Sequence, residues 1–258
     1  MASFAPMNIF WLLFLVHIAI AQRYLGKFRF EDDDIKTRAN LRDGIGRRRS
    51  QKYFHESTFS AFYDARYGKG SLPYDDRRNQ LSALTKAYLT TMDDIGIETW
   101  LMHGSLLGWY RNGKLIPENF DIHVQVADAS MQHLASYYNM SVHSVKLASR
   151  DENRDYLLEI NPNWMDASTT DVENQIDARW FDTTTGLYIN ITALRWDEEA
   201  KSRGIDGRVM CKDDHHYLHN DIFPLRDGTF EDAPVKIPFA YANILVEEYG
   251  KESLDNYS

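Results

Sequence analysis

The sequence of 258 residues contains a single cysteine, Cys211. One cysteine excludes an intramolecular disulfide and a zinc site built on cysteines. The chain also lacks the excess of basic residues that is typical of proteins that bind nucleic acid, since its formal net charge is -9. We therefore expect no nucleic-acid partner. A locally positive pocket for a phosphate remains compatible with this balance.

No lysine or arginine precedes the apolar run at residues 8–21, and the run is shorter than the about 20 residues that a membrane span needs. It ends in Ala19-Ile20-Ala21, which has the small-x-small pattern of a cleavage site. Residues 1–21 are predicted to be a signal peptide or a short signal anchor. Either one directs the chain into the secretory pathway.

Internal repeats are absent. Residues 22–51 are charge-dense, with few groups to bury, and are predicted to be a linker. Residues 52–258 suffice for one domain. Hydrophobic periodicity predicts helices at 77–94, 129–138 and 241–249, and strands at 97–102, 121–126, 156–160, 176–181 and 187–194. This order indicates an α/β (α+β) fold with a mixed central sheet flanked by helices.

Gly104 and Ser105 follow the first strand, and a short helix is predicted to start at Ser105. Glycine lets a ligand approach the backbone, and the N–H groups at a helix start favour phosphate. Arg111, two turns on, is then a candidate for a second phosphate oxygen. The alternative is a plain strand-to-helix turn.

Asp121 and His123 lie two apart on a predicted strand, so their side chains share one face. Paired acids at this spacing bind a divalent metal, but here one member is a histidine. Asp177 and Arg179 are candidates to line the same pocket; an Asp–Arg pair that fixes the hairpin is the alternative. His215 and His219 could bind a metal if they were helical, and a solvated loop is the competing interpretation.

Five segments carry a family resemblance, which covers about residues 52–254. They are KYFHESTFSAFYDARY, ETWLMHGSLLGWYRNGKLIP, RDYLL, IDARWFDTTTGLYINITAL and FPLRDGTFEDAPVKIPFAYANILVEEYG. In this order they resemble the LicD/fukutin family, and most closely its fungal mannosylphosphate-transfer proteins, the mannosylphosphorylation regulators. The resemblance implies a nucleotidyltransferase-type fold for residues 52–258.

The same resemblance implies an activity. Family members transfer, or support the transfer of, phosphorylated groups from nucleotide-activated donors to glycans. For the fungal relatives this implies GDP-mannose as donor, a glycoprotein glycan as acceptor, a partner glycosyltransferase and Mn²⁺ or Mg²⁺ as metal. It also implies a membrane-anchored place in the Golgi lumen or secretion.

The chain departs from the family pattern where the metal is expected. After the proline the family shows Trp-Asp-x-Asp-Ile-Asp, whereas this chain has Asn119, Asp121 and His123 at the three aspartate positions. A later family aspartate is Asn190 here. The resemblance therefore places the catalytic positions at Asp121, His123 and Asn190, with Asn119 beside the substrate.

Three of these four acidic positions have lost their carboxylate. Hard ions prefer carboxylate oxygens, so Asp121 and His123 are weak ligands for Mn²⁺ or Mg²⁺; a softer ion such as Zn²⁺ is the alternative there. Three functions stay open: an active phosphosugar transferase, a non-catalytic regulator that keeps the fold and assists a true transferase, and a secreted carbohydrate-binding protein. The missing acids favour the regulator.

Overall fold

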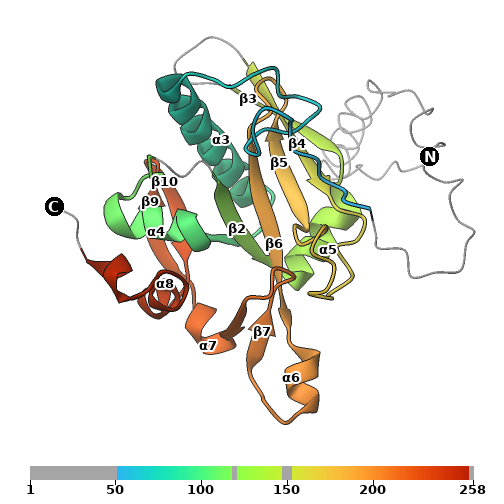
Figure 1. Ribbon diagram of the computed structural model, residues 1–258, viewed down its shortest axis with the longest axis vertical. Helices are drawn as coiled ribbons and strands as arrows, with labels where there is room; N and C mark the ends of the chain where they lie inside the picture. The colour runs from blue at the N-terminus through green and yellow to red at the C-terminus, as the bar shows by residue number, and fades with distance from the viewer. Residues whose placement is uncertain (1–50, 118–120, 147–152, 256–258) are drawn as a thin grey trace, which may run out of the picture. The chain divides into compact units, whose positions relative to one another are not determined.

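The computed structural model describes residues 51–117, 121–146 and 153–255, which belong to one compact unit (Figure 1). The predicted signal segment, residues 1–21, and nearly all of the predicted linker lie outside the described residues, as does Asn119. Within the described ranges, none of the helices combines the length and the apolar character needed to cross a membrane.

The described residues form a ten-stranded mixed sheet whose main path runs β3-β4-β5-β6-β2-β1-β10-β9. β7 pairs with the end of β6, and β8 pairs with β7. The pairs β2–β6 and β1–β10 are parallel, and the other pairs are antiparallel. The strands are β1 Thr99–Leu101, β2 Ile122–Ala127, β3 Ser141–Lys146, β4 Asn153–Ile160, β5 Ala178–Asp182, β6 Tyr188–Trp196, β7 Arg208–Met210, β8 His216–Leu218, β9 Arg226–Phe230 and β10 Ala233–Ile237.

Six α-helices and one 3-10 helix accompany the sheet in the described part of the chain. They are α3 Tyr74–Asp94, α4 His103–Asn112, α5 Asp128–Tyr137, α6 Glu198–Ser202, α7 His219–Ile222, α8 Tyr241–Tyr249 and η1 Lys251–Leu254. α4 and α8 lie side by side (Figure 1). The predicted fold class, a mixed sheet flanked by helices, is confirmed and is consistent with a nucleotidyltransferase fold.

The long helix α3 covers the apolar face of the sheet. Its buried side chains include Leu84, Tyr88 and Met92, which recur at the three- and four-residue steps of an amphipathic helix. The Tyr88 ring meets the Trp180 ring of β5 edge to face, with centroids 6.0 Å apart. The helix starts three residues before the predicted position 77, directly after Pro73. Its first turn is exposed and lacks the apolar period, so hydrophobic periodicity does not reveal this start.

The opposite face of the sheet carries a polar row. The strand register places His123 beside Asn190, Asn190 beside Arg179, and Arg179 beside Glu159, across β2, β6, β5 and β4. Neighbours in such a register point to the same face, so these four side chains form one line. The alternating positions Ile122 and Trp180 point to the α3 face and belong to the main core.

The turn between β5 and β6 is held from two sides. Asp182 accepts hydrogen bonds from the backbone of Thr184 and pairs with Arg154 at 2.6 Å. Gly186 ends the turn at φ 81°, and a Cβ built there would lie 2.5 Å from the backbone nitrogen of Gly68. The predicted hairpin is therefore confirmed, and its glycine is needed both for backbone conformation and for space.

Two glycines allow the effect of backbone strain to be separated from the effect of steric overlap when a methyl group is added. Gly204 also has φ 81°, but nothing lies within 4 Å of the position that a Cβ would take there. We expect Gly204→Ala to lower the free energy of unfolding by about 1 kcal/mol through backbone strain alone, and Gly186→Ala by about 2–4 kcal/mol through strain and overpacking. Urea unfolding followed by tryptophan fluorescence measures both. Equal losses would show that the Gly68 contact does not matter.

Candidate functional site

The three positions predicted to be catalytic meet at one edge of the polar row. Asp121 directly precedes β2, and its Oδ2 lies 2.7 Å from Nε2 of His123. Its Oδ1 accepts a hydrogen bond of 2.9 Å from Nδ2 of Asn190 on β6. The parallel register of β2 with β6 therefore brings together residues that are 69 positions apart.

Arg179 fixes how Asn190 is oriented. Its Nε donates to Oδ1 of Asn190 at 2.9 Å, and its Nη2 donates to Glu56 at 2.7 Å. The guanidinium also lies 3.9 Å from the centroid of the Tyr188 ring, a cation–π contact. With the amide oxygen held by Arg179, the amide NH₂ must face Asp121. Asn190 thus offers Asp121 a donor.

This donor set does not fit Mg²⁺ or Mn²⁺. Both oxygens of Asp121 face protein nitrogens, and the acceptor oxygen of Asn190 is already bonded to Arg179. A hard cation needs several oxygen ligands aimed at one point. Among the described residues of this centre, Asp121 supplies the one carboxylate in contact with His123 and Asn190. Among the described residues, this geometry gives no support to catalysis through a resident Mg²⁺ or Mn²⁺.

The turn predicted to bind phosphate, at Gly104 and Ser105, makes a structural hydrogen bond within the protein. Helix α4 starts at His103, two residues before the predicted start. Gly104 and Ser105 are buried in its first turn, and the Ser105 hydroxyl accepts a hydrogen bond of 2.9 Å from the backbone N–H of His123. Arg111 is exposed in the last turn of α4, about 10 Å along the helix from Ser105. The structure therefore joins Ser105 to the Asp121 centre and places Arg111 at the other end of the helix.

Asp177 belongs to a separate buried ion cluster. Its oxygens accept from Arg195 at 3.0 and 3.2 Å and from the backbone of Ala193 at 2.8 Å, and Lys212 lies 3.7 Å away. Burial raises the pKa of this carboxyl, against the lowering effect of Arg195. The alternative of a structural Asp–Arg pair describes Asp177 well, although its partner is Arg195. Arg179, which we grouped with Asp177, is part of the Asp121 centre.

A cavity of about 150 Å³ opens beside Arg179. Nucleotide-sized ligands need about 300–1,000 Å³, so this cavity alone is too small for a nucleotide sugar. It is lined by Lys52, Phe54, Glu56, Asn161, Val172, Glu173, Asn174, Gln175, Ile176 and Arg179.

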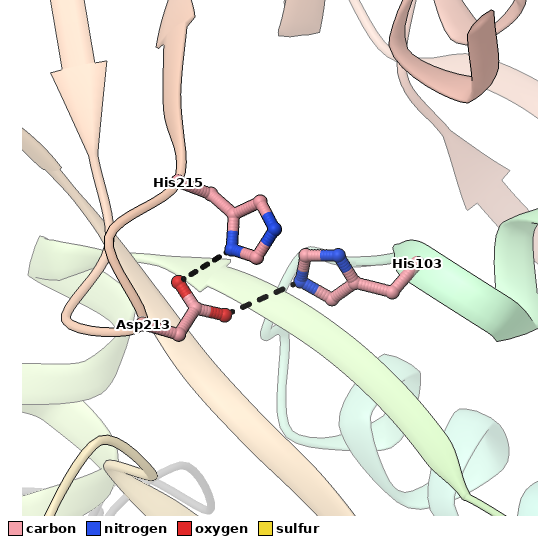
Figure 2. A group of neighbouring side chains, drawn as sticks. All are labelled: His103, Asp213 and His215. Atoms are coloured by element: carbon pink, nitrogen blue, oxygen red, sulfur yellow. Dashed lines mark ion pairs between the residues drawn. The ribbon is translucent and has the colours of Figure 1, made fainter. Parts of the chain in front are cut away.

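A second cluster, which we did not predict as a unit, adjoins the Asp121 centre. His103, Asp213 and His215 offer ligand atoms that all lie within 4.8 Å of one another (Figure 2). The His103 ring meets the His123 ring edge to face, with centroids 5.5 Å apart. Burial lowers the pKa of His103, but the carboxylates of Asp213 and Glu248 outweigh it and raise the pKa to about 9.

The helical alternative for His215 and His219 is wrong. Residues 216–218 form strand β8, and His219 starts helix α7 with its ring stacked on Trp196 at 5.1 Å. His215 instead pairs with Asp213, whose carboxylate raises the pKa of His215. The motif KDDHH hinted at this cluster, but the third member, His103, lies more than 100 residues earlier in the sequence.

Asp121 should make part of the stability pH-dependent. Burial raises its pKa, but His123, Arg179 and Asn190 together lower it below the usual 3.8. A carboxyl whose pKa is lower in the folded state stabilises the fold above its unfolded pKa, and this contribution disappears as pH falls through the folded value. We expect Asp121→Asn to lower the free energy of unfolding by about 1 kcal/mol at pH 7, since the side chain is 41% exposed.

The deficit of this variant relative to the unmodified chain should shrink as pH falls below about 4. Urea unfolding at several pH values between 3 and 7 measures it. Asp206→Asn makes the same chemical change at an exposed position and serves as the control. A deficit of constant size over the whole pH range would contradict the assignment.

Comparison with known proteins agrees with the geometry. Residues 96–240 match the family model "LicD/FKTN/FKRP, nucleotidyltransferase domain", which is more than half of the chain. Two relatives from Saccharomyces cerevisiae are similar: Mannosyltransferase regulator 4, 25% identical over 78% of this chain, and Mannosyltransferase regulator 14, 26% identical over 58%. The matches span 16% and 17% of the two yeast proteins' own lengths. The resemblance seen in the sequence is confirmed: the chain belongs to the LicD/FKTN/FKRP nucleotidyltransferase-domain family.

Proposed function

We propose that this chain acts in the modification of glycoprotein glycans as a regulator of mannose-phosphate transfer, without itself catalysing the transfer through Mn²⁺ or Mg²⁺. One observation carries the proposal: the carboxylate of Asp121 is bonded by His123 and by an amide NH₂ that Arg179 holds in place. Hydrogen-bond donors of the protein thus occupy the positions at which a catalytic metal would need oxygen ligands.

The relatives support the regulatory part of this proposal. The two similar yeast proteins are named mannosyltransferase regulators. By the same reasoning the chain works in the secretory pathway, in the Golgi lumen, beside a partner glycosyltransferase. GDP-mannose and the acceptor glycan are the ligands that such a regulator would recognise.

The chemistry of the polar row suits recognition. Arg179 supplies a fixed guanidinium, and Asp121 with His123 supplies an acceptor and a polarised ring beside the first turn of α4. Carboxylates and imidazoles bind sugar hydroxyls by hydrogen bonds, and guanidinium groups bind phosphate. These groups hold a ligand in position and need no metal to do so.

Restoring the family's acids should restore metal binding. The triple variant Asn119→Asp, His123→Asp, Asn190→Asp restores the family's carboxylates, two of them at positions that contact Asp121, and a divalent cation would relieve their repulsion. We expect Mn²⁺ affinity to rise at least about tenfold over the unmodified chain. Isothermal titration calorimetry with Mn²⁺, with and without GDP-mannose, measures this. Asn112→Asp, on the exposed last turn of α4, controls for added charge.

The same titrations can overturn the proposal. If the unmodified chain binds GDP-mannose only together with Mn²⁺, and Asp121→Asn abolishes this coupling, the chain is an active phosphosugar transferase. If a mannose-containing glycan binds and GDP-mannose does not compete, the alternative of a secreted carbohydrate-binding protein replaces the regulator.

A further inference from the structure

We propose that His103, Asp213 and His215 bind a zinc ion. They come from two segments far apart in the sequence: His103 is the first residue of α4, while Asp213 and His215 lie in the connection between β7 and β8. Figure 2 shows the three side chains pointing toward one another. One ligand atom from each lies within 4.8 Å of the others, so small side-chain rotations would bring all three to the about 2.0–2.2 Å from one ion that zinc needs.

The atoms that face one another in this cluster lack hydrogen-bond partners. Nε2 of His103 lies 3.3 Å from Oδ2 of Asp213, and Nδ1 of His215 lies 3.2 Å from Oδ1 of Asp213. These contacts do not have hydrogen-bond geometry, so three buried atoms, one on each residue, are unsatisfied: Nε2 of His103, Oδ1 of Asp213 and Nδ1 of His215. Buried polar atoms are rarely left in this state, and one ion would satisfy all three.

Glu248 of α8 contacts His103 but is not one of the three proposed zinc ligands. Its Oε2 lies 3.1 Å from Nδ1 of His103, and its Oε1 accepts from the Tyr217 hydroxyl at 3.1 Å. When Nδ1 of His103 donates to Glu248, Nε2 is the ring nitrogen left to exchange its proton for a metal ion. Glu248 therefore fixes which nitrogen of His103 would bind the zinc, and Nε2 is the one that lies beside Asp213.

The backbone supports the same conclusion. His103 adopts φ 52° and Asp214 adopts φ 66°, in the left-handed region that side chains other than glycine seldom occupy. Such strain persists where the surroundings impose it, and it is common at ligand-binding positions. Here it occurs on both segments that carry the cluster.

The donor set selects the kind of ion. Two imidazole nitrogens and one carboxylate oxygen suit Zn²⁺, which accepts three protein ligands and keeps a fourth position for water or substrate. Mg²⁺ and Ca²⁺ prefer oxygen ligands throughout, and Mn²⁺ binds nitrogen-containing sites more weakly than Zn²⁺. The two carboxylates, Asp213 and Glu248, balance the charge of a divalent ion when both histidines are neutral.

The test uses full-length protein without a histidine tag, stripped of metal by a chelator. Calorimetry with ZnCl₂ should give about one zinc per chain with Kd below about 1 µM, and elemental analysis after gel filtration should find the ion retained. Zinc at about 100 times Kd should raise Tm by about 5–10 °C. Mn²⁺ should bind at least about tenfold more weakly.

Neighbouring histidines provide a matched pair of variants. His215→Ala should abolish tight zinc binding, while His216→Ala, one residue on and paired with Asp197, should keep it. Asp213→Asn keeps the side-chain shape and should also lose binding, and Glu248→Gln should weaken it about 10–100-fold. Urea unfolding of each variant without zinc shows that it is folded.

Three results would overturn the zinc site. These are a Kd for the unmodified chain weaker than about 1 µM, equal affinity of the His215→Ala variant and the unmodified chain, and equal affinity for Mn²⁺ and Zn²⁺. After either of the first two results the cluster would be a network of ion pairs around His103, and the third would refute the selection of zinc by the donor set.

Discussion

The hydrogen bond from Arg179 to the amide oxygen of Asn190 decides the character of the Asp121 centre. An amide has one acceptor end and one donor end, and the guanidinium occupies the acceptor end. The donor end is then committed to Asp121 at 2.9 Å. Replacing an aspartate by asparagine at this position therefore does more than remove a charge, because it converts a potential metal ligand into a group that repels a cation. The strand register β2–β6–β5 enforces this order, since it sets the three side chains in one row.

The two clusters share one contact, between the rings of His103 and His123, with centroids 5.5 Å apart. His123 belongs to the centre built on β2 and β6, while His103 opens α4 and faces the β7–β8 connection. Ser105 ties the same helix turn to the backbone of His123. The start of α4 therefore contacts both clusters, and a ligand at the Asp121 centre would lie next to an ion held by His103.

The sequence predicted the parts of the molecule that depend on local pattern. The apolar steps of α3, the β5–β6 hairpin and the terminal helix 241–249 each follow from periodicity and turn residues, and all three are present. Strands β3 and β7 to β10 were missed, because each has too few apolar residues in sequence to mark a strand. The proximity of Asp121 and Asn190 could be anticipated only from the family resemblance. The cluster of His103 with Asp213 could not, because it depends on how the connection after β7 returns toward α4.

A count of charges shows where the domain needs a cation. Around Asp121, the carboxylates of Asp121 and Glu56 are matched by Arg179 and Lys52, which pairs with Glu56 at 2.5 Å. Counted over the described residues, these charges cancel without any ion, and an added divalent cation would bring unbalanced positive charge. Around His103, by contrast, Asp213 and Glu248 supply two negative charges in a largely buried setting with no lysine or arginine among the contacts that bind these carboxylates in the described structure. Buried charge must be compensated, and the two carboxylates raise the pKa of His103 to about 9. A zinc ion would compensate both carboxylates. By this count, the proposed ion belongs to the histidine cluster and not to the carboxylate centre of the family's pattern.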